Sequence, residues 1–153
     1  MGEVIFNESL IIKLDNLETD KEALSEIVDH LYNKGYVKEG YKEAILERES
    51  EFPTGIFTGG INVAIPHADV SFVNQASIAV GILDKPVKFH IMDEPENEID
   101  VHLIIMLALK EPHGHIQMLQ KVVSLIQNQE SIKEIISSNK TNTAYEIISK
   151  HLM

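Results

Sequence analysis

Residues 62–67 read Asn-Val-Ala-Ile-Pro-His, a short apolar run that stops at a proline and is followed at once by a histidine. Aliphatic and β-branched residues on successive positions are typical of a strand covered on both faces, so a buried strand is predicted at 61–65. Proline cannot continue a central strand and fixes its own φ, so Pro66 is expected to end the strand and hold His67 at a defined angle. His67 is therefore a candidate reactive group.

The segment before this strand is rich in glycine and reads Pro53-Thr54-Gly55-Ile56-Phe57-Thr58-Gly59-Gly60. Glycine permits backbone conformations closed to other residues and allows another molecule to come close, so this composition favours a binding site over a plain connection. The alternative interpretation is a tight turn followed by a solvated surface histidine.

Strand and helix patterns alternate along the rest of the chain. A capping-box pattern at residues 19–22 predicts the start of a helix, and Gly35 is its expected end. The further expected strands are 10–12, 78–83 and 101–109, and the further expected helices are 41–50, a stripe over 116–126, 131–138 and 141–152. This order predicts an α/β fold, a single domain spanning residues 1–153 with a central mixed β-sheet flanked by helices on both faces.

Charge and composition exclude several classes of function. With 24 acidic and 13 basic residues the formal net charge is -11, which argues against nucleic-acid binding. The chain has no cysteine, so neither a disulfide framework nor a thiolate mechanism is available. The N-terminus has no signal-peptide pattern, and the longest apolar run, 103–109, is too short to span a bilayer. We therefore expect a cytoplasmic protein.

Arg48 is the only arginine in the chain. Its spacing from Tyr41, Ala44 and Ile45 predicts that the guanidinium lies on the core-facing side of the helix at 41–50, where a charge requires an anionic partner. That partner is either one of the glutamates at positions 47, 49 and 51 or a phosphate group that comes and goes. Guanidinium suits phosphate oxygens better than ammonium does.

A histidine-containing cluster, Glu111-Pro112-His113-Gly114-His115, marks the passage from a strand to a helix. Helix N-termini attract anions through unpaired N–H groups and the helix dipole, and the same field favours a neutral imidazole. His115 begins the apolar stripe of the helix, so it is expected to point inward more than His113. His67, His113 and His115 also suit zinc, but their spacing matches no metal motif, and we expect no metal.

These residues together resemble a known family. Arg48-Glu49, Pro53-Thr54-Gly55, the run 60–67 and His115-Ile116-Gln117-Met118-Leu119 match the ordered signature of fructose/mannitol-type IIA components of the bacterial phosphoenolpyruvate-dependent sugar phosphotransferase system. The resemblance covers nearly the whole chain. The amino-acid sequences of residues 58–67 and 110–113 are most similar to the galactitol-type branch.

The resemblance implies a phosphoryl carrier without metal or organic cofactor. In this family the histidine of the Pro-His motif accepts a phosphoryl group from the phosphocarrier HPr and passes it to a cysteine of a IIB component, which phosphorylates sugar entering through the membrane IIC permease. His67 matches the phosphoacceptor, and Arg48 and His115 match the supporting positions, with His113 as the alternative to His115. Galactitol or a related polyol is the implied sugar.

This sequence departs from mannitol-like members by extra residues between the arginine and the motif and by Asp69. Two other functions stay open at this point. One is a regulatory phosphoacceptor of the nitrogen-related IIA type without a permease, and the other is a binding module in which His67 only follows a strand.

Overall fold

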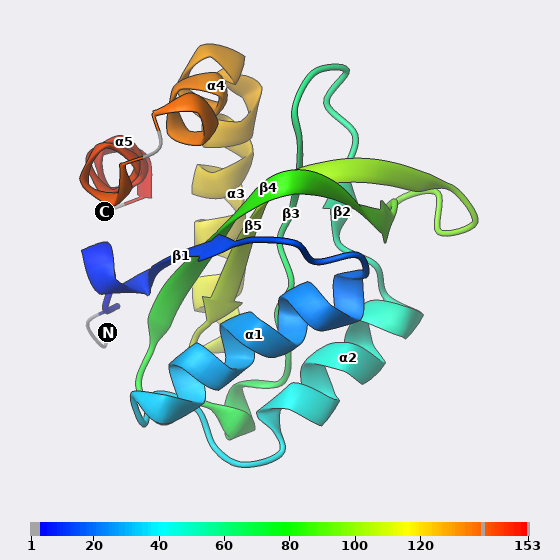
Figure 1. Ribbon diagram of the computed structural model, residues 1–153. Coiled ribbons are helices and arrows are strands. Elements are labelled where there is room, and N and C mark those ends of the chain that lie inside the picture. Colours follow the sequence, from blue (N-terminus) through cyan, green and yellow to red (C-terminus); the bar gives the residue numbers. More distant parts are fainter. Residues whose placement is uncertain (1–3, 139, 153) are drawn as a thin grey trace.

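The computed structural model describes residues 4–138 and 140–152, and for residues 112–115 it describes the backbone alone (Figure 1). These residues form a five-stranded sheet with the order β1-β4-β5-β3-β2. The strands are β1 (Ile11–Leu14), β2 (Gly55–Ile56), β3 (Asn62–Ala64), β4 (Ser77–His90) and β5 (Glu98–Ala108). β1 runs parallel to β4 and β3 parallel to β5, whereas β2–β3 and β4–β5 are antiparallel, so the predicted mixed sheet is confirmed.

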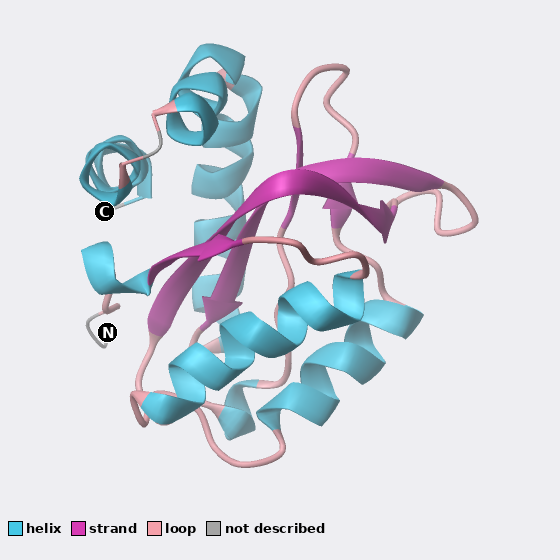
Figure 2. Cartoon of the chain, viewed as in Figure 1, coloured by secondary structure: helices cyan, strands magenta, loops and turns pink. Residues whose placement is uncertain are grey.

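Helices cover both faces of this sheet (Figure 2), as predicted. Figure 1 shows α1 (Asp20–Asn33) and α2 (Tyr41–Glu51) on one face, and α3 (Pro112–Gln127), α4 (Gln129–Ser137) and α5 (Thr141–Leu152) on the other. Two short 3-10 helices, η1 (Glu8–Leu10) and η2 (Val70–Phe72), complete the described elements. No helix among the described residues combines the length and apolar character needed to cross a bilayer.

Local sequence signals account for the boundaries of α1. The Thr19 side chain accepts a hydrogen bond from the Glu22 N–H, and the Glu22 side chain accepts one from the Thr19 N–H, which is the predicted capping box. Gly35 follows the helix with a φ of 79°, a left-handed conformation that favours glycine.

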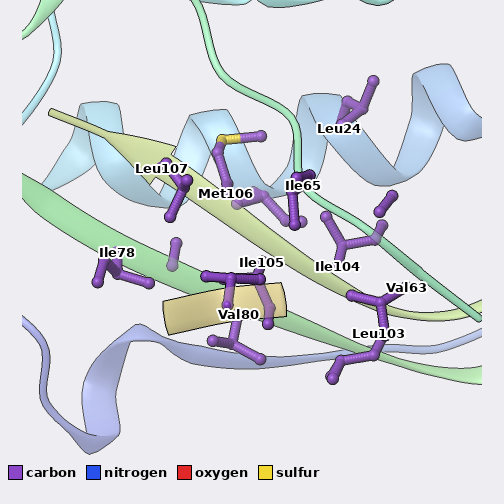
Figure 3. Packing of buried hydrophobic residues seen from close by; sticks show 14 of the residues in the cluster. Leu24, Val63, Ile65, Ile78, Val80, Leu103, Ile104, Ile105, Met106 and Leu107 are labelled. Carbon is purple, nitrogen blue, oxygen red and sulfur yellow. The ribbon is translucent and has the colours of Figure 1, made fainter. Parts of the chain in front are cut away.

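The core lies against both faces of β5. Figure 3 shows consecutive β5 residues packed among side chains of α1, β3 and β4, and residues 103–108 are all fully buried. A strand whose successive side chains are all buried must be covered above and below, because they point to opposite faces. This explains why the run at 101–109 reads as continuously apolar.

Two strand features differ from the sequence prediction. β4 continues to His90, because beyond a break in register between Ile82 and Val87 it pairs with β5 again as far as Glu98. β2 was not expected, because its two residues lie inside the glycine-rich segment. β2 is the edge strand beside β3, the strand that leads to His67.

Candidate functional site

His67 stands just beyond the C-terminal end of β3. The backbone keeps the β3 register past Ala64, so that His67 forms an isolated parallel bridge with Leu107, and the Leu107 N–H donates to the Pro66 carbonyl at 3.0 Å. The backbone carbonyl of Ile65 orients the half-buried ring, because its oxygen lies 3.0 Å from Nδ1 of His67. A carbonyl can only accept, so Nδ1 carries the proton and the lone pair of the neutral ring is on Nε2.

The ring of His67 is biased toward its neutral form. Burial lowers the pKa of His67 below its ordinary value of 6.5, and the positive charge of Arg48 lowers it further. The hydrogen bond to the Ile65 carbonyl acts in the opposite direction but is outweighed by burial. The imidazole is therefore in its neutral form at physiological pH.

Arg48 lies in the last turn of α2, and its predicted core-facing position is wrong. Its side chain is exposed, whereas the buried positions of α2 are Tyr41, Ile45 and Glu49. The physical reason is that a guanidinium at the border of the apolar stripe can stay in water, while the neighbouring carboxyl at position 49 finds hydrogen-bond donors inside.

The guanidinium of Arg48 rests on an aromatic ring. Its central carbon lies 5.3 Å from the centroid of the Phe52 ring, a cation–π arrangement one helical turn along the chain. Among the side chains that the structure describes, none of the three predicted glutamates forms an ion pair with Arg48. A guanidinium held by a ring face keeps its N–H groups available to an anion.

A surface groove joins Arg48 to the segment that follows His67. Its lining includes Arg48 and Phe52 from one side and Ala68, Asp69 and Phe72 from the other. Ala68 is the next residue after His67, so the groove that Arg48 lines reaches the residue beside the predicted histidine. Four glutamates spaced one helical turn apart also line it: Glu39, Glu43, Glu47 and Glu51.

Asp69 serves the local backbone in this groove. Its side chain accepts from the Ser71 N–H at 2.8 Å and caps η2. The hydrogen bonds from Ser71 hold the pKa of Asp69 below its ordinary value, and the charge of Arg48 acts in the same direction. Asp69 therefore places a fixed negative charge beside the candidate site.

The third predicted site residue, His115, and its alternative, His113, have side chains outside the described residues. Their backbone belongs to the first turn of α3, which begins five residues after Leu107, the bridge partner of His67. The supporting histidine stays a prediction. Within the part of the chain whose side chains are described, no group of three potential metal ligands comes together.

Two glycines of the glycine-rich segment serve the packing of the chain itself, and the expectation that the segment admits another molecule stays a prediction. A Cβ at Gly55 would lie 2.5 Å from the backbone oxygen of His90 on β4, and one at Gly60 would lie 2.5 Å from the side-chain oxygen of Gln129. Gly59 has a φ of 81° and makes the turn into β3. These glycines therefore build the edge of the sheet.

Two residues near the site were missed by reasoning from sequence. Phe52 stands four positions after Arg48, a spacing that brings side chains together at a helix end and was a usable signal. The burial of Glu49 gave no signal, since its interior hydrogen bonds to Thr54 depend on how the chain returns after α2.

Comparison with known proteins identifies related sequences. Residues 4–151 match the family described as "Phosphoenolpyruvate-dependent sugar phosphotransferase system, EIIA 2". The fructose-specific EIIABC component of Bacillus subtilis is 32% identical over 92% of this chain, which spans 22% of that longer protein. The galactitol-specific EIIA component of Escherichia coli K12 is 27% identical over 86% of this chain and 87% of its own length.

The fold also matches a solved structure. The Escherichia coli enzyme IIA for mannitol, in its complex with phosphorylated enzyme IIB, superimposes with a TM-score of 0.79 at 20% identity. The match covers 97% of this chain and 99% of that one.

Proposed function

We propose, on the premise that this chain belongs to the EIIA type 2 family of the phosphoenolpyruvate-dependent sugar phosphotransferase system and is a phosphotransferase, that His67 carries its phosphoryl group. The observation that carries the proposal is the orientation of the ring. Nδ1 is directed at the Ile65 carbonyl at 3.0 Å, which assigns the attacking lone pair to Nε2.

The transfer step follows from this tautomer. Nε2 of the neutral imidazole attacks the phosphorus of the donor phosphohistidine, a new N–P bond forms, and the donor N–P bond breaks with its electron pair returning to the donor. No proton has to leave Nε2, because the ring proton is already on Nδ1. The Ile65 carbonyl stabilises the positive charge that the ring gains as the phosphoryl group arrives. In the next transfer, a thiolate attacks the phosphorus on His67 and forms an S–P bond, while the N–P bond breaks and its electron pair returns to Nε2.

Arg48 binds the phosphoryl oxygens in this proposal. Phosphoryl transfer depends mostly on in-line positioning and on stabilising charge on the equatorial oxygens. An exposed guanidinium that rests on Phe52 and lines the groove beside residue 68 meets the second requirement. His115, at the N-terminus of α3, is the proposed second donor, with His113 as the alternative.

The proposed donor is HPr, and the proposed acceptor is a cysteine of a IIB component that serves a membrane IIC permease. The mannitol IIA of Escherichia coli forms a complex with phosphorylated IIB, which supports a IIB partner. Galactitol or a related polyol is the proposed sugar, supported by the galactitol-specific relative that matches this chain along most of its length. The groove is on the surface, so two proteins can reach it in turn.

Mass spectrometry tests this function. The protein is incubated with phosphoenolpyruvate, enzyme I and HPr, and IIB components for galactitol, mannitol and fructose are then added separately. We expect one phosphoryl group on His67, its loss on addition of the cognate IIB, and no labelling of His67→Ala. His90→Ala, which alters a half-exposed histidine elsewhere, is the matched control.

Two outcomes would redirect the proposal. Phosphate that persists in folded His67→Ala on His113 or His115 would reassign the acceptor. Phosphorylation of His67 without transfer to any IIB component would favour a regulatory domain of the nitrogen-related IIA type.

A further inference from the structure

Glu49 is a buried carboxyl group that the proposed transfer step does not use. Glu49 is only 6% exposed to solvent. One carboxyl oxygen accepts from the Thr54 N–H at 2.8 Å, and the other accepts from the Thr54 hydroxyl at 2.7 Å. Among the described side chains no cation pairs with it, so these two hydrogen bonds are its identified compensation for burial.

The hydrogen bonds continue from Thr54 to the imidazole. The carbonyl of Thr54 accepts from the Ile65 N–H at 3.2 Å, and the carbonyl of Ile65 is the group that faces Nδ1 of His67 at 3.0 Å. Thr54 and Ile65 are 2% and 1% exposed, so water does not compete for these groups. A chain of hydrogen bonds thus connects the carboxyl of Glu49 to the ring of His67 through Thr54 and Ile65.

Glu49 also belongs to the helix turn that carries the guanidinium. Glu49 follows Arg48 directly, and the Phe52 N–H closes this turn by donating to the Arg48 carbonyl at 2.6 Å. Arg48 belongs to α2 and His67 follows β3, and residues 52–54 form the short connection between α2 and β2, the strand that pairs with β3. Glu49 ties the end of α2 to Thr54 across this connection.

We propose that Glu49 is a positioning residue that sets the placement of the His67 imidazole relative to the Arg48 guanidinium. Thr54 transmits this placement through its N–H, its hydroxyl and its carbonyl. This inference rests on the proposed function for its effect on rate, and on geometry alone for its effect on the ring.

The first test is Glu49→Ala, which leaves the Thr54 N–H and hydroxyl without their acceptor. Under single-turnover conditions with saturating phospho-HPr, we expect phosphorylation of His67 to slow at least tenfold. Nitrogen NMR of protein labelled with 15N in histidine reports the ring directly. We expect His67 to change from the Nδ1–H tautomer toward a mixture with the Nε2–H tautomer.

Three variants separate positioning from loss of stability. Thr54→Ser keeps both donors and should retain the wild-type rate and tautomer. Thr54→Val keeps the backbone N–H but removes the hydroxyl, so it should fall between wild type and Glu49→Ala, and it replaces that variant if Glu49→Ala does not fold. Ile132→Ala truncates a fully buried side chain of α4 on the opposite face of the sheet and controls for destabilisation.

Each outcome decides the inference. A slower rate and an altered tautomer in Glu49→Ala, with neither in Thr54→Ser or Ile132→Ala, would support it. An unchanged tautomer and rate in folded Glu49→Ala, or equal effects in Ile132→Ala, would overturn it. If wild-type His67 accepts no phosphoryl group, the proposed function fails, and the tautomer measurement still decides whether Glu49 positions the ring.

Discussion

The stability of this protein should fall as pH rises through neutrality because of Glu49. Burial raises the pKa of this carboxyl from its ordinary value of 4.5 to about 7, against the opposing effect of the hydrogen bonds from Thr54. The folded state therefore keeps a proton that the unfolded chain releases above pH 4.5. Stability from this group is fully present below that value and is lost as pH rises through about 7.

The size of the effect follows from the two pKa values. Their difference corresponds to ~3 kcal/mol in the free energy of unfolding over the whole range, since each pH unit is worth 1.36 kcal/mol. Linkage places roughly 2 kcal/mol of this loss between pH 5.5 and pH 8.5. Glu49→Gln removes the titration and preserves the contacts, because its amide oxygen can accept from the Thr54 N–H while its amide nitrogen donates to the hydroxyl.

Urea denaturation of wild type and Glu49→Gln at pH 5.5, 7.0 and 8.5 measures the difference. We expect the variant to gain roughly 2 kcal/mol relative to wild type between the two extremes. Other titrating groups, His67 included, cancel in this comparison. Glu47→Gln, which alters an exposed carboxyl on the same helix, should follow the wild-type profile. Parallel profiles for Glu49→Gln and wild type would refute the reasoning that burial controls this carboxyl.

Three further predictions concern the groove and the sheet edge. Phe52→Leu should slow phosphorylation about threefold by removing a cation–π contact of 0.5–1 kcal/mol, whereas Phe57→Leu, at another exposed aromatic residue, should leave the rate unchanged in the same stopped-flow assay. Gly55→Ala should lose ~2 kcal/mol or more in urea denaturation, because its Cβ meets a backbone oxygen of β4 at 2.5 Å; wild-type stability would contradict this close approach. The single-turnover rate of His67 should rise with pH through a pKa below 6.5 and be level from pH 7 to 8, since burial and Arg48 keep the ring neutral; a rate still rising above pH 7 would contradict that.

The main elements of the fold were predictable because their signals are local. The capping box at Thr19 predicts a helix and the apolar run at 101–109 predicts a strand, and neither prediction depends on the rest of the chain. The end of β4 was missed because Pro86 and its charged neighbours read as a turn, although the alternating burial from Val87 to His90 is the pattern of a half-exposed strand. β2 was missed because two residues carry no periodicity.

The candidate site was predictable where a short stretch of sequence determines the local backbone, as Pro66 does for His67. Pro66 follows the strand and places His67 just beyond it, which residues 62–67 already indicate, whereas the register that sets His67 opposite Leu107 depends on pairing with β5. The side of α2 that holds Arg48 could not be read, because positions 48 and 49 both border the apolar stripe and only the interior donors of Thr54 decide which one is buried. The orienting carbonyl of Ile65 was also beyond reach, since the sequence does not indicate which backbone group the ring of His67 faces.

The placement of charge explains how a carrier of this kind can both bind and release a phosphoryl group. A guanidinium about 4 Å from a phosphoryl oxygen contributes about 4 kcal/mol at the effective dielectric of a protein surface, and this attraction would be stronger if the pair were buried. Arg48 is exposed, and glutamates from every fourth position of α2 line the same groove, so its attraction for the group is limited. The structure buries the carboxyl of Glu49 instead, and both of its oxygens accept hydrogen bonds from Thr54. In our proposal, rigidity at the site comes from a buried acid that does not contact the transferred group, and affinity comes from a cation that water can screen. Under this proposal the ring is held firmly, while the phosphoryl group is held weakly enough to be passed on.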